Sequence, residues 1–220
     1  MSNIINEDIT EYLDQMYEPI NQAMAEFRKK DEPKIPIIRR NAEALMAVLL
    51  TKLQPKKILE IGTATGYSAS VMAYALPECL ITTIESYEPR YRAALGNFEK
   101  LGIADRIEAK LGDGSDVLEE MYQSGCGIYD FIFIDAAKSH YREFWDKAVK
   151  MGAPGTVVLC DNVLLDGIVA DEKYLETRRD RTSMSRMREF LDYINNKEDV
   201  KTCVLPVGDG ISISVLKDRK

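Results

Sequence analysis

The chain has 220 residues, of which 45% are hydrophobic and 30% charged, and its formal net charge is −7. This balance is typical of a folded globular protein, and the acidic total argues against one that coats nucleic acid by bulk electrostatics. No apolar run approaches the roughly 20 residues of a membrane span, and residues 1–10 lack signal-peptide features. The four cysteines form no CxxC pair, which excludes zinc-finger and thioredoxin classes. We expect one domain, 1–220, in the cytoplasm.

The first 35 residues are predicted to be a helical extension. Ile9, Leu13 and Met16 recur at helical spacing, and the run from Ile20 to Phe27 repeats it. Prolines at 33 and 36 interrupt the pattern. A third helix is expected over residues 38–53.

After residue 55, short apolar runs alternate with longer helical stretches. This alternation is typical of right-handed βαβ units, which build a parallel sheet with helices on both faces. The expected strands are 58–61, 80–84, 106–111, 131–134 and 156–160, and the expected helices lie near 67–76, 89–101, 115–123, 140–150 and 181–195. Asp209-Gly210, between apolar runs 202–206 and 211–216, is typical of a hairpin turn. The sheet is therefore expected to end in an antiparallel pair.

Carboxylates follow four successive predicted strands. Ligands of open α/β sheets bind at the carboxyl ends of the strands, so these side chains are candidates for a site. The residues that follow the five strands are Gly62, Glu85, Asp113, Asp135 and the pair Asp161-Asn162. A single Asp at such a junction can be only a helix cap. Four in succession favour a binding site.

The first turn, Gly62 to Gly66, indicates a cofactor other than a dinucleotide. Ala64 stands where a dinucleotide motif has the glycine that lets the backbone approach a pyrophosphate. S-adenosylmethionine (SAM) has no pyrophosphate. Glu85, 23 residues after Gly62, has a spacing suited to a ribose diol, and Asp113 could accept a hydrogen bond from an adenine amino group.

The remaining carboxylates suggest a metal. Asp135, Asp161 and Asn162 offer three hard oxygen ligands, which suit Mg²⁺, although Asp161-Asn162 could be only a turn pair. Zinc is not expected, since His140 is the only histidine. Lys138, three residues after Asp135, could act as a general base or be an ordinary surface lysine.

Three segments resemble a known family. Residues 59–68 (LEIGTATGYS), 134–138 (IDAAK) and 161–164 (DNVL) are similar to the metal-dependent O-methyltransferases of the catechol and caffeoyl-coenzyme A type. The resemblance runs from about residue 35 to residue 216. Within the family, the bacterial tRNA 5-hydroxyuridine methyltransferases are the most similar group, because they share residues 54–62 and the C-terminal hairpin.

This resemblance implies a Rossmann-like class I methyltransferase fold with a seven-stranded, mostly parallel sheet, and a homodimer. It places the cofactor at Ile38, Gly62, Ser68, Glu85, Asp113 and Asp135. It places the metal at Asp135, Asp161 and Asn162, and it makes Lys138 the base. Many relatives have a glycine near the stretch Arg39-Arg40-Asn41, so contacts to the amino-acid end of the cofactor are less defined here.

The expected reaction is methyl transfer from SAM to a hydroxyl whose neighbouring oxygen also binds the metal. Both 5-hydroxyuridine in tRNA and a small catechol supply such a pair of oxygens. The basic stretches 28–40 and 173–188 and the resemblance favour tRNA, and a catechol-like compound is the alternative. A nicotinamide-dependent oxidoreductase and a non-catalytic SAM-binding module are the competing classes.

Overall fold

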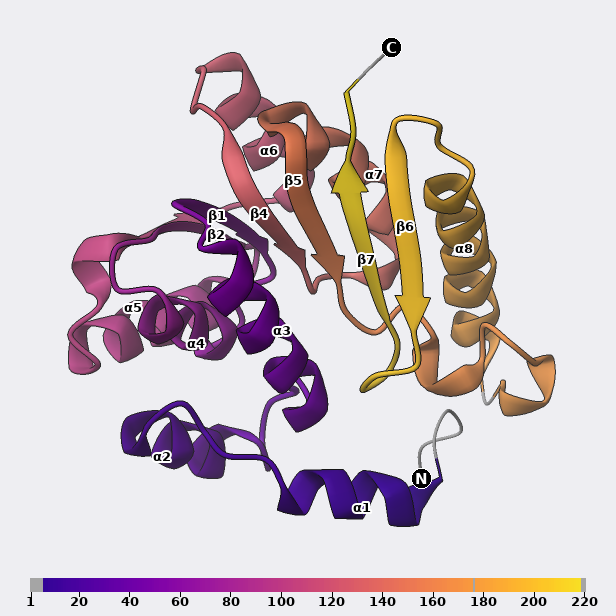
Figure 1. The fold of residues 1–220 in the computed structure, drawn as a ribbon, viewed down its shortest axis with the longest axis horizontal. Helices are drawn as coiled ribbons and strands as arrows, with labels where there is room; N and C mark the ends of the chain where they lie inside the picture. The colour runs from indigo at the N-terminus through magenta and orange to yellow at the C-terminus, as the bar shows by residue number, and fades with distance from the viewer. Residues whose placement is uncertain (1–5, 176, 219–220) are drawn as a thin grey trace.

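A seven-stranded sheet forms the centre of the computed structural model, which describes residues 6–175 and 177–218 (Figure 1). The strands are β1 (Lys57–Ile61), β2 (Leu80–Glu85), β3 (Ile107–Leu111), β4 (Tyr129–Ile134), β5 (Gly152–Cys160), β6 (Val200–Leu205) and β7 (Ile211–Leu216). Their order is β3-β2-β1-β4-β5-β7-β6. Strands β1 to β5 are parallel, and β7 is antiparallel to both its neighbours. The strand order reverses at β1, which creates a crevice at the carboxyl ends of β1 and β4.

Helices pack on both faces of this sheet. One face is covered by α3 (Arg40–Leu53), α4 (Tyr67–Ala75) and α5 (Glu88–Lys100), and the other by α6 (Gly114–Gln123), α7 (Tyr141–Ala148) and α8 (Arg178–Asn195). Helices α1 (Glu7–Gln15) and α2 (Gln22–Asp31) lie beyond the arrowheads of β4 and β5 (Figure 1). Short 3-10 turns span Ala104–Arg106, Lys138–His140, Val149–Met151, Leu165–Gly167 and Glu172–Tyr174. None of the described helices is long and apolar enough to span a bilayer.

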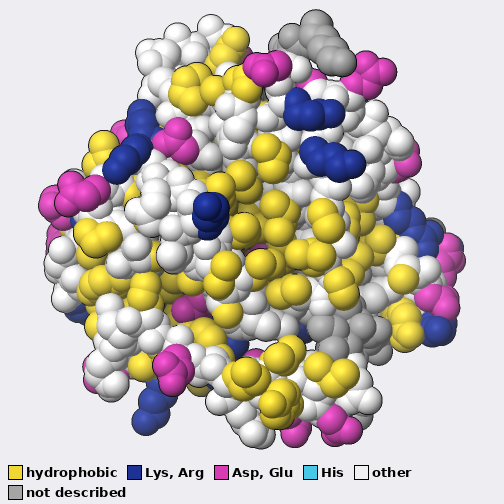
Figure 2. Space-filling model, viewed as in Figure 1, with side chains coloured by type: hydrophobic (Ala, Val, Ile, Leu, Met, Phe, Trp, Pro, Cys, Tyr) yellow, Lys and Arg dark blue, Asp and Glu magenta, His cyan; other side chains and the backbone are white. Residues whose placement is uncertain are grey.

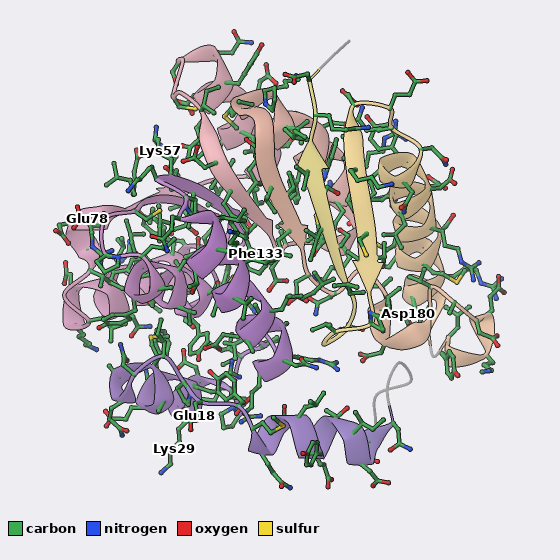
Figure 3. All side chains as sticks on the ribbon, in the orientation of Figure 1. Glu18, Lys29, Lys57, Glu78, Phe133 and Asp180 are labelled. Carbon is green, nitrogen blue, oxygen red and sulfur yellow. The ribbon has the colours of Figure 1, made fainter. Side chains whose placement is uncertain are left out.

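Two hydrophobic layers stabilise the fold because the β1, β4 and β5 side chains alternate between the faces of the sheet. Ile58 and Phe133 pack toward α3 and α4, whereas Leu59 and Ile132 pack toward the opposite helices. Phe133 is fully buried and lies near the centre of the molecule (Figure 3). The two hydrophobic layers therefore pack against both faces of the sheet and hold the strands, including their carboxyl ends, in place.

The predicted sheet, its terminal antiparallel pair and the helices on both faces are confirmed. The predicted helix over 38–53 begins later, at Arg40, because Arg39 has an extended conformation at the N-cap. Strand β5 begins at Gly152, before the predicted 156. The predicted apolar stripe does fall on α1 and its C-cap, but Ile9, Leu13 and Met16 are 52%, 38% and 64% exposed. The spacing of apolar residues thus predicts helix α1, but it does not predict whether another part of the protein covers the apolar face of that helix.

Gly62 allows β1 and β4 to approach each other at the site. Its φ is +106°, and a Cβ placed there would overlap the carbonyl oxygen of Asp135. The Asp135 amide donates to Ile61 O at 2.9 Å, which continues the ladder past the ends of both strands. Only glycine satisfies both the conformation and the close backbone contact.

We expect Gly62→Ala to lower the free energy of unfolding by more than about 3 kcal/mol, because the backbone of Asp135 would have to move. Gly102→Ala is the matched control, since Gly102 also has a positive φ of +66° but a Cβ placed there would meet no neighbouring atom within 4 Å. The control should lose only about 1–2 kcal/mol. Denaturant unfolding of both variants checks this, and equal losses would contradict the steric explanation.

Candidate functional site

A cavity of about 700 Å³ lies at the carboxyl ends of β1, β2, β4 and β5. It contains all nine residues that the sequence predicted for the site. These are Ile38, Gly62, Ser68, Glu85, Asp113, Asp135, Lys138, Asp161 and Asn162. The structure therefore brings the predicted residues together, and their individual roles stay predictions.

Glu85 clamps the glycine-containing turn at one end of the cavity. One oxygen of its carboxylate accepts from the Ala64 amide and the other from the Tyr87 amide, both at 2.8 Å. Glu85 is 7% exposed. Asp113 also faces the cavity, but its Oδ1 accepts from the Ser115 amide at 2.9 Å. Asp113 is therefore a helix cap that also lines the cavity, and its assignment to the cofactor stays a prediction.

Glu60 is a buried carboxylate beneath this turn that the sequence reasoning missed. It is completely buried on β1 and accepts from the hydroxyls of Ser68 and Thr83, each at 2.5 Å. Burial raises the pKa of Glu60 to about 7, although the two hydrogen bonds oppose the rise. The sequence does contain a signal for this buried carboxylate, because Glu60 is the only charged residue in the apolar run 58–61. Ser68, predicted at the cofactor, faces the cavity with its hydroxyl committed to Glu60.

Lys138 occupies the centre of the other end of the cavity. Its ammonium donates to Asp135 Oδ1 at 2.9 Å, to Asn162 Oδ1 at 2.6 Å and to the Tyr141 hydroxyl at 2.9 Å. The 3-10 turn after β4 positions it, since Lys138 begins that turn and Tyr141 begins α7. A cation is therefore held here by two of the three residues that the sequence predicted as metal ligands, Asp135 and Asn162.

Asp161 and Asn162 are held rigidly at the end of β5. Asp161 is 1% exposed, and Asn162 adopts a left-handed φ of +56°, which asparagine tolerates better than most residues. Burial, with the nearby charge of Asp135, raises the pKa of Asp161 above its ordinary range. Tyr141 donates its hydroxyl proton to the Asp161 carbonyl at 2.6 Å, and burial raises the pKa of this phenol, so it stays a donor.

The chemistry of these donors fits a hard divalent cation. Carboxylate and amide oxygens are the ligand types that Mg²⁺ prefers, and they are supplied here by Asp135, Asp161 and Asn162. The Lys138 ammonium already lies between Asp135 and Asn162. The described residues contain no cluster of three or more His, Cys, Asp or Glu side chains arranged for a metal. A metal at this position would therefore depend on the Asn162 amide as its third ligand.

The turn between β6 and β7 supports the same end of the cavity. The Val163 amide donates to Gly210 O at 2.9 Å, and the Leu164 amide donates to Asp209 O at 3.0 Å. The Asp209 carboxylate faces the cavity and accepts from the Asp166 amide, and burial raises its pKa to about 6. Sequence reasoning treated Asp209 only as a turn residue. Its second role, holding the loop at Asp166, depends on a contact between residues far apart in the chain, which no local sequence pattern predicts.

The N-terminal helices are connected to the cavity by a buried ion pair. Arg28 of α2 is 4% exposed, and its guanidinium donates to Glu43 at 2.6 Å and to the Ile38 carbonyl at 2.8 Å. Tyr67, which lines the cavity, donates to the same Glu43 at 3.0 Å. These hydrogen bonds hold the Ile38 backbone beside the cavity. Arg28 is therefore part of a buried ion pair and not of a basic surface patch.

Comparison with known proteins identifies the chain. A family model described as O-methyltransferase matches residues 10–217. The chain belongs to the O-methyltransferase family. Family membership confirms the prediction of an O-methyltransferase and excludes the oxidoreductase alternative.

Several relatives of this O-methyltransferase match nearly its whole length. A catechol O-methyltransferase from Niastella koreensis is 32% identical over 228 residues, covering 99% of this chain and all of the relative. A Bacillus cereus O-methyltransferase, solved in complex with S-adenosylhomocysteine (SAH), superposes with a TM-score of 0.82 at 26% identity, over 96% of this chain and 97% of the other. A Staphylococcus aureus protein, provisionally described as a caffeoyl-CoA O-methyltransferase, gives 0.88 at 27% identity, over 96% and 100%.

We expect Glu60→Gln to flatten the pH dependence of stability. The pKa of Glu60 is raised from 4.5 to about 7 in the folded protein, so ionisation destabilises the fold as pH rises through this interval. Between pH 5 and pH 8 the wild type should lose up to roughly 3 kcal/mol of unfolding free energy relative to the variant. Denaturant unfolding at both pH values measures this, with exposed Glu99→Gln as control. Parallel pH curves for wild type and Glu60→Gln would contradict the assignment.

Proposed function

We propose that this O-methyltransferase transfers the methyl group of SAM to a hydroxyl that has a second oxygen on the neighbouring atom, with a divalent cation such as Mg²⁺ at Asp135, Asp161 and Asn162. The observation that supports this most directly is the position of Lys138. Its ammonium lies between Asp135 and Asn162, beside buried Asp161 and at the opposite end of the cavity from Glu85. The cavity therefore has two chemically different ends.

The end formed by β1, β2 and β3 suits the cofactor. Glu85 keeps free carboxylate acceptor capacity beyond its two backbone amides, which a ribose diol could use. The backbone of the Gly62 turn lines the cavity, and Ile38 contributes apolar surface beside it. The Bacillus cereus relative in complex with SAH supports SAM as the methyl donor of this chain.

The end formed by β4 and β5 suits the acceptor. The divalent cation, when bound, would favour the ionised form of the acceptor hydroxyl. Lys138 Nζ, in its neutral form, takes the hydroxyl proton and passes it to solvent, while the Tyr141 hydroxyl holds that nitrogen in position. The acceptor oxygen then forms its bond to the methyl carbon as the sulfur–carbon bond breaks, with alignment of both reactants in one cavity lowering the barrier.

A small catechol-type compound is the acceptor that we favour. The Niastella koreensis catechol O-methyltransferase matches this chain end to end. The basic stretch 28–40, which made tRNA attractive, is largely paired within the protein. Arg28 is buried against Glu43, Arg39 pairs with Asp166, and Arg40 pairs with both Asp14 and Glu32. Lys29 is exposed but points away from the body of the molecule (Figure 3).

The 5-hydroxyl of 5-hydroxyuridine in tRNA is the second candidate. A depression next to the Lys138 end of the cavity is lined by Ser139, Thr182 and Arg186, and the last of these is a cation that could meet a phosphate. Arg186 donates to the Ser139 carbonyl at 3.2 Å and is exposed. This depression favours a substrate longer than a catechol.

We also propose that two copies of the chain associate. In the view of Figure 1, no described helix lies in front of β5, β7 and β6, and hydrophobic side chains gather there in Figure 2. Val48 and Leu53 of α3 and Val215 of β7 are exposed by 66%, 41% and 37%. An apolar face of this kind is typical of an interface.

The test is a methyl-transfer assay with labelled SAM and Mg²⁺, offering catechol and tRNA that contains 5-hydroxyuridine in separate reactions. We expect label in catechol and loss of that label when a chelator is added. Label in tRNA alone would establish the second candidate. Transfer that a chelator does not reduce would contradict the metal site.

The role of Lys138 is tested in the same assay. We expect Lys138→Gln to lower kcat by roughly 10²- to 10⁴-fold, the range of general-base catalysis, with the Kd for SAH unchanged. Lys100→Gln, at the exposed end of α5, is the matched control. An active Lys138→Gln enzyme would show that another group takes the proton.

A further inference from the structure

We infer that a second cavity, at the opposite end of the sheet from the candidate site, binds a small organic anion. The ligand that fits it best is a phosphate monoester attached to an apolar body of about the size of one ring. This second site is independent of which methyl acceptor the main cavity takes.

The second cavity has a volume of about 390 Å³ and lies where β5 and β6 begin and β7 ends, at the upper edge of the sheet in Figure 1. It shares no lining residue with the main cavity. Strand β4 runs beside β5 from one cavity to the other, and its six residues at ~3.3 Å each separate the two by roughly 20 Å. A volume of this size suits a small molecule.

An irregular start of β5 forms one wall of the second cavity. The register between β4 and β5 shifts between Tyr129 and Phe131, so the beginning of β5 carries extra residues. Ala153 and Pro154 are among them, and both line the cavity. The Ala153 amide donates to the Thr156 hydroxyl at 2.9 Å, which fixes the irregular segment. Bulges of this kind are common beside binding sites, because they re-aim the chain locally.

The second cavity is positively charged although the protein is acidic. Three lysines line it against a single acid, which gives a formal charge of +2; these residues are Lys150, Lys197, Lys217 and Asp199. The main cavity instead has five acidic side chains against three of Lys or Arg, and the chain as a whole carries −7. A local excess of cations in a hollow attracts anions. A phosphate monoester carries about −1.5 to −2 at pH 7, which matches this charge.

Lys197 is held over the wall of the cavity. Its side chain is 24% exposed, and its ammonium donates to the Tyr193 hydroxyl at 3.3 Å. The same ammonium lies 4.9 Å from the centre of the Tyr193 ring and 5.7 Å from that of Trp145. The Asp199 carboxylate is 3.6 Å away, beyond hydrogen-bond distance. Among the described residues, one of the three N–H donors of Lys197 is therefore used, and a phosphate oxygen could accept from the others.

The other two lysines also keep donors for a ligand. Lys150 is 45% exposed, and its Nζ lies 3.9 Å from Glu119 Oε2, which is a long ion pair. The Lys217 side chain makes no hydrogen bond or ion pair with the described residues. Its backbone is nevertheless fixed, because the Lys217 amide donates to the Asp199 carbonyl at 2.8 Å. The cavity thus presents ammonium groups from three separate segments of the chain.

The remaining wall of the cavity is largely apolar. It includes Trp145, Val149, Val200 and Leu216. An inorganic anion would leave this surface uncovered, whereas a ring attached to the phosphate would remove it from water. The indole N–H of Trp145 is buried without a hydrogen-bond partner among the described residues, which is unusual for tryptophan. A ligand oxygen, or a water bound beside it, would satisfy this donor.

The experiment uses the fluorescence of Trp145, the only tryptophan of the chain, to follow titrations with phenyl phosphate, benzoate and inorganic phosphate. We expect a saturable change with phenyl phosphate at a Kd below about 1 mM. Inorganic phosphate should bind roughly tenfold more weakly because it lacks the ring, and benzoate should also bind more weakly because it carries one charge. Saturating SAH should leave all three Kd values unchanged, since it occupies the main cavity.

Lys197→Gln and Lys217→Gln should each weaken phenyl phosphate by roughly tenfold, the effect of losing one charge-assisted contact. Lys201→Gln is the matched control, because Lys201 is exposed on β6 next to the cavity without lining it. Calorimetry on the same solutions detects any binding that leaves Trp145 unaffected. Heat without a fluorescence change, competition by SAH, equal affinity for inorganic phosphate, no binding, or equal losses in Lys217→Gln and Lys201→Gln would overturn the inference.

Discussion

The accumulation of carboxylates where the parallel strands end is the constraint on which the site depends. Glu85, Asp113, Asp135 and Asp161 all face one cavity, and Glu60 lies buried beneath it. Like charges at short range in a partly buried space are unfavourable unless cations compensate them. Lys138 supplies one ammonium among these groups. The arrangement therefore favours positively charged ligands, and a sulfonium cofactor and a divalent cation meet that requirement.

The surrounding structure maintains this costly arrangement. Gly62 lets the backbones of β1 and β4 meet, Tyr141 fixes the carbonyl of Asp161, and the turn at Asp209 fixes the loop beyond β5. These contacts come from segments far apart in the sequence. The raised pKa of Glu60 shows that the same burial that makes the site rigid also lowers the stability of its ionised form. Binding energy from charged ligands can offset that loss.

The sequence predicted the sheet and the membership of the site because both follow from local rules. Strand patterns place the residues after each strand at one edge, so Glu85, Asp135 and Asp161 could be assigned to one cavity without coordinates. The pairing of Arg28 with Glu43 and of Arg39 with Asp166 could not be predicted, because helix packing and a loop conformation bring those partners together. For the same reason, most of the basic stretch 28–40, which suggests phosphate binding in the sequence, is paired internally.

The measurement that most directly tests the central claim is an anomalous X-ray diffraction experiment on crystals grown with SAH and Mn²⁺, a divalent substitute for Mg²⁺. The account predicts one strong anomalous peak in contact with Asp135, Asp161 and Asn162, with the Lys138 ammonium displaced from between Asp135 and Asn162. It also predicts SAH beside Glu85. Bound SAH with no peak at these three residues, or with Lys138 still between its two partners, would contradict the claim that this edge of the sheet is a paired cofactor and metal site.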